Sequence, residues 1–479
     1  MTAVLAARAP RVAAEPTLAS ATLPRPGPAG TPGEPGPRSP DAEPPAATVL
    51  PGDESGRIDA AFDAESDDAA ARRALRTVLW VPRLVVNVAL SPLRLAAWAN
   101  DRYHLRELYD RVFFNDAQTI GLVPSASFDT GFGVTAGARF VDRDLLGDHE
   151  HLSIEASAGG RYQQAYRATL HTGDRLGKRL TIEIAGQYEL RPKDTFHGIG
   201  DHDDSARPAA PVDPRLDPTA VEVRYRERIA RVAGTADLRI VDRFHLRGSA
   251  ELTDRTFAAS ATGTPIDAIY DPMALVGYGG VRACYGELEL RFDSRGRVAV
   301  YEPQPFYATG SLAAAFAGRV HRLGDGPDYW RYGIDVQHFV RLGDGPRVLA
   351  LRLRGEGVSG RLSEVPFTEL PQLGGADDLR GYPTDRFRDR GRLLGSVEYE
   401  WDLSAQVSAG VFVDAGRVFP SLGDVLARRA RVGYGVALQA HSDSAFGVEA
   451  SLASSADGGV FLSLSFNSIF ALDERVRRR

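Results

Sequence analysis

From about residue 119 onwards, apolar and polar residues alternate with a period of two, in stretches of roughly ten residues. In 180–191, for example, Leu180, Ile182 and Ile184 alternate with Thr181 and Glu183. A period of two places successive side chains on opposite faces of a β-strand. The pattern therefore predicts a sheet whose strands have one apolar and one polar, often charged, face.

The alternation defines sixteen spans, which we predict to be strands: 119–128, 132–142, 150–158, 162–172, 179–191, 219–241, 243–256, 281–293, 305–318, 329–342, 346–357, 393–402, 405–414, 430–441, 445–453 and 459–467. A single-chain transmembrane barrel of bacteria has an even number of such strands. A two-sheet sandwich would give the same alternation, with its apolar faces turned inward. The even count and the strand length favour an all-β fold, a sixteen-stranded antiparallel transmembrane β-barrel.

The predicted connections also favour a barrel. The long ones are 192–218, 257–280 and 358–392, and each joins an odd-numbered strand to the next even-numbered one. Short periplasmic turns and longer external loops are typical of outer-membrane barrels, and a sandwich has no reason to sort its loops in this way. A spanning helix is not expected, because the most apolar segment, 78–98, is interrupted by charged residues and prolines.

The segment before the strands divides into two parts. Residues 1–52 contain twelve of the thirty prolines and an acidic stretch follows, so 1–68 is predicted to be a disordered leader. Residues 69–118 are predicted to be a short helical segment in the periplasm, which could pack on the barrel rim, the membrane surface or a partner. The barrel is expected over 119–470, and 471–479 forms a basic tail.

Two stretches carry the most specific motifs: PQLGGADDLRGYPTDRF at 371–387 and VFVDAG at 411–416. With FHGIGD at 196–201 and DSR at 293–295, they resemble the BamA/TamA family of outer-membrane proteins, also called bacterial surface antigens. The resemblance implies a sixteen-stranded barrel, with a four-residue motif in the sixth external loop and a second motif on the thirteenth strand. The first motif corresponds to Leu379, Arg380, Gly381 and Tyr382, and the second to Phe412, Asp414 and Gly416.

The register of the thirteenth predicted strand suggests how these motifs could meet. Asp414 faces inward, opposite to Val411 and Val413. A buried carboxylate favours a cation, and an arginine can bind it with two hydrogen bonds. We therefore expect the sixth external loop to fold into the lumen and to bring Arg380 to Asp414. In the alternative, Arg380 lies on a solvated loop and Asp414 pairs with a neighbouring strand.

The last predicted strand resembles the terminal assembly signal of such barrels. Its residues are Gly459, Leu462, Leu464 and the terminal aromatic Phe466. The family's inserting members receive their clients through periplasmic polypeptide-transport-associated domains, each a small α/β unit. Residues 1–118 show no strand pattern and are too few for these domains, so we expect the chain to lack them.

The sequence contains no recognisable catalytic or nucleotide-binding motif, and we expect no enzyme activity, metal or cofactor. The net charge of −6 argues against nucleic acid as a partner. Outer-membrane lipid and a periplasmic protein are the expected partners. Three functions remain open: a barrel that aids protein or lipid assembly or transport with a separate partner, a plugged structural or surface-exposed barrel without transport, and, with least support, an outer-membrane lipase.

Overall fold

In the computed structural model, the described residues are 111–129, 133–160, 163–177, 179–201, 222–296, 309–343, 347–404, 407–425, 430–441 and 446–465. Their strands are β1 (Ile120–Asp129), β2 (Gly133–Asp142), β3 (His151–Gly159), β4 (Gln163–His171), β5 (Leu180–Phe196), β6 (Val223–Val241), β7 (Phe244–Ala259), β8 (Val281–Asp293), β9 (Gly310–Arg322), β10 (Tyr329–Arg341), β11 (Arg347–Val358), β12 (Gln372–Leu373), β13 (Phe387–Arg388), β14 (Gly391–Ser404), β15 (Val407–Phe419), β16 (Arg431–His441), β17 (Phe446–Ser455) and β18 (Val460–Ser465). Three short 3₁₀ helices lie in the connections: η1 (Ile266–Ala268), η2 (Pro272–Ala274) and η3 (Leu422–Asp424).

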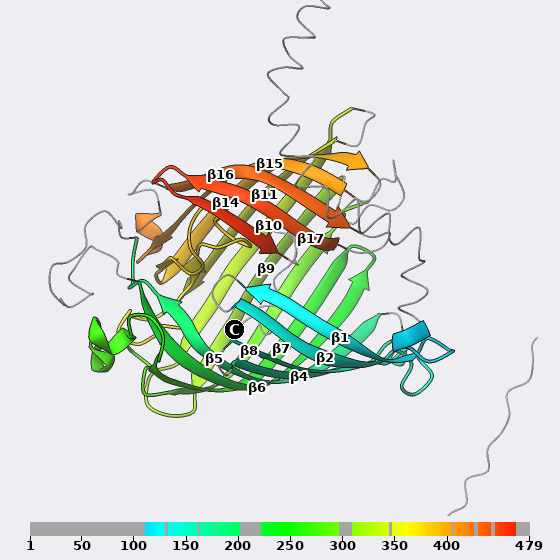
Figure 1. The fold of residues 1–479 in the computed structure, drawn as a ribbon, viewed down its shortest axis with the longest axis horizontal. Coiled ribbons are helices and arrows are strands. Elements are labelled where there is room, and N and C mark those ends of the chain that lie inside the picture. Colours follow the sequence, from blue (N-terminus) through cyan, green and yellow to red (C-terminus); the bar gives the residue numbers. More distant parts are fainter. Residues whose placement is uncertain are drawn as a thin grey trace, which may run out of the picture. The chain divides into compact units, whose positions relative to one another are not determined.

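Sixteen of these strands form one antiparallel sheet, in which each strand pairs with the next along the chain from β1 to β18, and β12 and β13 form a separate pair. The sheet curls around an inner space (Figure 1). The predicted number and order of strands are confirmed. Among the described residues, no pairing joins β1 to β18. No helix within these described ranges is long and apolar enough to cross a membrane.

The sheet exposes its apolar face and buries its charged face, which is the reverse of a water-soluble sandwich. On β8 the outward-facing Leu288 and Leu290 are 64% and 53% exposed, whereas Glu287 and Glu289 are 6% and 1% exposed. The same inversion holds on β15, where Val411 and Val413 are exposed while Asp414 is fully buried. A soluble sandwich buries its apolar face. An exposed apolar face around a charged interior instead suits a sheet surrounded by lipid.

Several strand boundaries differ from the prediction. β5 continues beyond the predicted end at residue 191 to Phe196, through a register irregularity between Arg191 and Asp194. This irregularity accommodates Pro192, which has no N–H to donate to the ladder. β15 continues beyond residue 414 to Phe419. β9 is described from Gly310, and the predicted start at residue 305 lies outside the described residues.

The three long connections fall where they were predicted, between β5 and β6, β7 and β8, and β11 and β14. Side chains from these regions pack together in one apolar cluster, which includes Phe196 at the end of β5, Tyr270 in the β7–β8 loop and Phe367 in the β11–β14 loop. The predicted leader (1–68), most of the predicted helical segment (69–118) and the basic tail (471–479) lie outside the described residues.

Candidate functional site

The β11–β14 loop, residues 359–390, is the sixth odd-to-even connection of the sheet and folds against the sheet's inner face. Leu373, Leu379 and Phe387 of this loop pack in one buried cluster with Leu394 of β14 and Val418 of β15. The pairing of β12 with β13 closes the loop on itself. The loop is therefore a packed part of the interior.

Glycines allow the tight path of this loop. Gly374, Gly375 and Gly381 have φ values of 118°, 103° and 90°, a region that favours glycine. At Gly381 a Cβ atom would lie 2.4 Å from the carbonyl oxygen of Ser454, which belongs to β17. A side chain at Gly381 would therefore push the loop away from the strand.

Arg380 lies at the centre of the site. Its Nε and Nη2 donate to the two carboxylate oxygens of Asp414, at 2.8 and 3.0 Å, and its backbone N–H donates to Oδ2 at 3.2 Å. Nη1 donates to Glu398 of β14 at 2.9 Å, and Glu449 of β17 lies 3.7 Å away. The side chains of Arg380, Asp414 and Glu398 are fully buried. One guanidinium thus binds three strands of the wall through buried, charge-assisted contacts.

The electrostatics keep this arginine charged. Burial alone would lower the pKa of Arg380, but the carboxylates of Glu398 and Asp414 outweigh it and hold the pKa above its usual value. The guanidinium also lies over the ring of Phe412, with its central carbon 3.3 Å from the ring centroid. The loop motif and the motif of the thirteenth strand of the large sheet, β15, therefore meet at Arg380.

Three glycines on β15 and β16 make room for this arrangement, and the sequence reasoning did not single out any of them. A Cβ atom at Gly433 would lie 1.7 Å from the carbonyl oxygen of Arg380. Added Cβ atoms at Gly410 and Gly435 would lie 2.8 Å from Glu398 Oε1 and 2.7 Å from the ring of Phe412. Gly416, which the motif did include, has Leu373 of the loop at 3.3 Å from such an atom.

Tyr382 ties the loop to a second group of charges. Its hydroxyl donates to Asp457, in the β17–β18 turn, at 2.7 Å. Arg431, at the start of β16, donates to Asp457 at 2.8 Å and to Asp201 at 2.7 Å. Burial and the negative charge of Asp457 raise the pKa of Tyr382 to about 12. Asp201 is the last residue of the FHGIGD stretch, so this chain of contacts joins three connections of the sheet.

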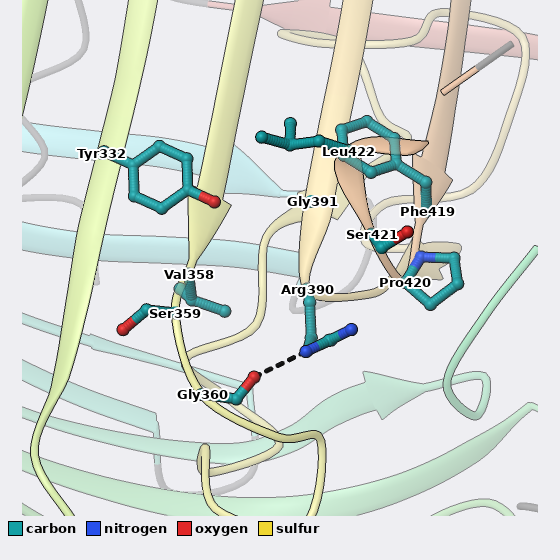
Figure 2. Close-up of a pocket in the computed structure, with 10 residues that line it drawn as sticks. All are labelled: Tyr332, Val358, Ser359, Gly360, Arg390, Gly391, Phe419, Pro420, Ser421 and Leu422. Atoms are coloured by element: carbon teal, nitrogen blue, oxygen red, sulfur yellow. Dashed lines mark hydrogen bonds between the residues drawn. The ribbon is translucent and has the colours of Figure 1, made fainter. Parts of the chain in front are cut away.

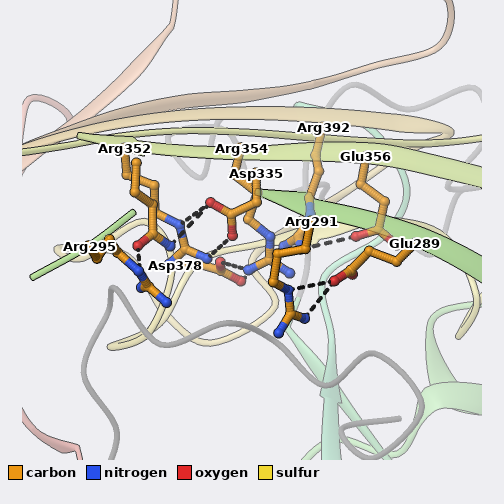
Figure 3. Close-up of polar contacts among 10 residues, drawn as sticks. Glu289, Arg291, Arg295, Asp335, Arg352, Arg354, Glu356, Asp378 and Arg392 are labelled. Atoms are coloured by element: carbon orange, nitrogen blue, oxygen red, sulfur yellow. Dashed lines mark hydrogen bonds and ion pairs between the residues drawn. The ribbon is translucent and has the colours of Figure 1, made fainter. Parts of the chain in front are cut away.

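Asp378, two residues before Arg380, makes the opposite kind of contact. Its carboxylate accepts from Arg354 of β11 and from Arg392 of β14, both at 3.0 Å. Arg392 also pairs with Glu356 at 3.0 Å. Figure 3 shows Asp378 among these arginines, beside the Arg352–Asp335 pair of the wall. The sequence reasoning missed Asp378, although it lies within the quoted motif.

The predicted terminal signal lies apart from this constellation. Leu462 of β18 points outward and is 70% exposed, and it pairs with Leu452 of β17. Leu464 pairs with Ala450, and Gly459 ends the preceding turn with a φ of 88°. Phe466 lies outside the described residues. In the part of the chain that the structure describes, no group of three or more His, Cys, Asp or Glu residues could hold a metal ion.

Comparisons with known proteins agree with this architecture. Residues 304–452 match the Omp85 superfamily domain. The structure is similar to that of BamA from Haemophilus ducreyi lacking POTRA domains 1–3, with 16% identity, a TM-score of 0.51, and coverage of 72% of this chain and 69% of that one. CdiB from Acinetobacter baumannii aligns with 10% identity and a TM-score of 0.44, over 70% of this chain and 55% of that one. No curated protein sequence matches the chain.

The inverted faces of the sheet and the matched domain define an outer-membrane protein that crosses the membrane with strands. The sheet has a BamA-like fold, and the match of residues 304–452 to the Omp85 superfamily domain agrees with the resemblance that the motifs suggested.

Proposed function

We propose that this chain forms a closed sixteen-stranded barrel and works with a separate periplasmic protein to assemble or transport outer-membrane proteins or lipids. The observation that carries the proposal is how the β11–β14 loop is bound to the inner face of the sheet. Arg380 of this loop contacts Asp414, Glu398 and Glu449, and we call this set of contacts the seat of the loop. These contacts hold β14, β15 and β17 in fixed positions, and β17 pairs with the last strand of the sheet, β18. The Omp85 superfamily domain supports a role in assembly or secretion.

The buried charges on the inner face support the idea that the contacts of Arg380 serve a function beyond stability. A buried ion pair contributes little more to stability than well-packed apolar residues of similar volume would. Polar contacts do, however, fix one specific arrangement, and we propose that this arrangement keeps the C-terminal strands ready to receive a client or partner.

Depletion of the protein from its native host tests the proposal. We expect the folded, heat-modifiable fraction of other outer-membrane barrels, or the lipid content of the membrane, to fall. The wild-type chain should restore it and Arg380→Ala should not. Arg139→Ala is the matched control, because Arg139 pairs with Glu155 across β2 and β3, and it should restore the wild-type level. Unchanged barrels and lipids after depletion would contradict an assembly role.

A plugged structural barrel is the second candidate, and the packing of the long loops favours it. The ring of Phe196 meets those of Tyr270 and Phe367 at centroid distances of 4.9 and 5.4 Å, so aromatic contacts join three connections. In this case purified protein in planar bilayers would conduct poorly, and no periplasmic protein would co-purify from detergent-solubilised membranes. A co-purified periplasmic protein would favour the assembly or transport role.

A further inference from the structure

A cavity of about 260 Å³ lies on the outward side of the sheet, where β10, β11, β14 and β15 end near the β11–β14 loop. It is lined by side chains of two kinds. Tyr332, Val358, Phe419, Pro420 and Leu422 are apolar or aromatic, while Arg390, Ser359 and Ser421 are polar (Figure 2). The cavity is separate from the Arg380 site, which lies on the inner face.

The floor of the cavity follows from the strand register. Tyr332 on β10, Gly357 on β11, Gly391 on β14 and Phe419 on β15 are direct neighbours across four strands, and we call them the aromatic–glycine row. A Cβ atom at Gly357 would lie 2.9 Å from the ring of Tyr332, and one at Gly391 would lie 2.1 Å from the ring of Phe419. The two rings therefore lean over the glycines and form the walls of a hollow.

The hollow lies where lipid meets water. Tyr332 and its neighbour Trp330 are 37% and 51% exposed on the outward face, and aromatic side chains at this level form the interfacial girdle of membrane barrels. The exposed side chain of Leu422, on η3, adds an apolar wall. The long loops lie at this end of the strands, which places it on the external side, next to the outer leaflet.

The polar part of the cavity can bind an anion. Arg390 donates to the carbonyl oxygen of Gly360 at 2.6 Å, and among the described residues no carboxylate forms an ion pair with its guanidinium. Ser359 accepts a hydrogen bond from the backbone N–H of Trp330 at 2.8 Å, so its own hydroxyl hydrogen can point to a ligand. Asp424 lies close by, but its carboxylate accepts from the hydroxyl of Ser421 at 2.6 Å.

We propose that this cavity binds the headgroup of a phosphate-bearing lipid of the outer leaflet. The Arg390 guanidinium and the Ser359 hydroxyl would donate to the phosphate oxygens, because a planar guanidinium matches that group. The first part of an acyl chain would lie between the rings of Tyr332 and Phe419 and against Leu422. This inference does not depend on the proposed assembly function, since it concerns the outward face and a lipid already present in the membrane.

Native mass spectrometry of the purified full chain tests the proposal. The detergent-solubilised protein is mixed with phosphatidylglycerol or with diacylglycerol of the same acyl chains, which lacks the phosphate. We expect a one-lipid adduct that prefers the anionic lipid, and Arg390→Gln should lower that adduct by about tenfold through loss of a charged donor. Arg390→Lys should retain part of the preference. Arg347→Gln, at the exposed opposite end of β11, is the matched control and should behave like the wild type.

Two further measurements keep the test decisive. Leu422→Ala removes an apolar wall without changing charge, so it should weaken binding of both lipids, while heat-modifiability on gels shows that each variant is folded. Inorganic phosphate should compete only weakly with the lipid. Equal adducts with both lipids, or an unchanged adduct in Arg390→Gln, would overturn the proposal. Displacement of the lipid by an equal concentration of phosphate would also overturn it, by assigning the cavity to a free anion.

Discussion

The β11–β14 loop is held to the wall at two positions, and the two contacts differ in charge and in burial. Arg380 meets three carboxylates, and its side chain is fully buried together with those of Asp414 and Glu398. Asp378 meets two arginines, and its side chain is 22% exposed. The inner face of β14 changes sign along its length, with Arg392 near one end and Glu398 further along. Asp378 and Arg380, two positions apart, can therefore both meet a residue of opposite charge on the inner face in only one position of the loop along the strands.

The comparison implies that the two contacts contribute unequally. In the buried contact, neither partner can turn to water when the other is removed, so an uncompensated charge remains inside the protein. At Asp378, partial exposure lets water replace some of the lost contacts, and Arg392 keeps Glu356 as a partner. We expect Arg380 to determine whether the loop is seated, and Asp378 to refine its position.

The largest expected effect comes from Arg380→Ala. This change leaves the Asp414, Glu398 and Glu449 carboxylates without their common cation, at a cost of about 3–5 kcal/mol for a fully buried pair. The loop should become accessible to added protease, and the barrel should lose its heat-modifiable form at a lower temperature. Arg380→Lys should also be impaired, because an ammonium group cannot bind both oxygens of Asp414 in the same plane.

A double-mutant cycle with Asp414→Ala sharpens this first prediction. Because the two side chains are in direct contact, the combined loss should be smaller than the sum of the single losses. Additive effects would show that Arg380 and Asp414 stabilise the protein independently, and would contradict a direct interaction between them.

Gly433→Ala should have the next largest effect. Its new Cβ atom would meet the backbone carbonyl of Arg380 at 1.7 Å, and backbone cannot rotate away as a side-chain end can. Overpacking of this kind costs about 1–3 kcal/mol, and it should unseat the loop without removing any charge. Gly286→Ala on β8 is the matched control, since nothing lies within 4 Å of its added Cβ atom. Equal melting temperatures for the two variants would contradict a close fit at Gly433.

Asp378→Ala should have a smaller effect than either change. Loss of a hydrogen-bonding partner by a charged group typically costs about 1.5 kcal/mol when water can partly replace it. Limited proteolysis should show a loop that opens more often than in the wild type and far less often than in Arg380→Ala. If Asp378→Ala proved as damaging as Arg380→Ala, burial would not be what separates the two contacts.

Much of the fold could be predicted because it depends on a local pattern. The alternation of side chains fixed which residues face inward, including Asp414, and the loop lengths fixed which connections are long. The strand ends were less certain, because a bulge such as the one at Pro192 interrupts the alternation without ending the strand. β12 and β13 have two residues each, too few to show any period.

The contacts of the site were predictable only in part. The inward register of Asp414 and the glycines around Arg380 suggested their pairing, and the structure places the two within hydrogen-bonding distance. Glu398 and Glu449 also face inward, but which residues on different strands meet depends on the stagger between strands, which the pattern of one strand does not contain. Gly433 could not be identified, because its role depends on a carbonyl group 53 residues earlier in the chain.

The smallest expected effect concerns Tyr382. It distinguishes the contact between Tyr382 and Asp457 from the contacts that Arg380 and Asp378 make with the strands. The pKa of Tyr382 is raised to about 12 in the folded protein, because burial and the charge of Asp457 oppose ionisation of its hydroxyl. An unfolded tyrosine ionises near pH 10, so its contribution to stability is complete below about pH 10 and is lost as the pH rises towards 12. At neutral pH, Tyr382→Phe should cost about 1 kcal/mol through loss of the hydrogen bond to Asp457.

The pH dependence provides the measurement for this last prediction. Proteolysis of the loop, followed from pH 8 to pH 11, should increase in the wild type above about pH 10 and should increase less in Tyr382→Phe, which has no hydroxyl to ionise. Arg380 keeps its charge over this range, because its carboxylate partners raise its pKa above the usual value of an arginine. The inner contact should therefore hold while the Tyr382–Asp457 contact weakens. An identical pH response in wild type and Tyr382→Phe would show that another group controls the alkaline opening of the loop.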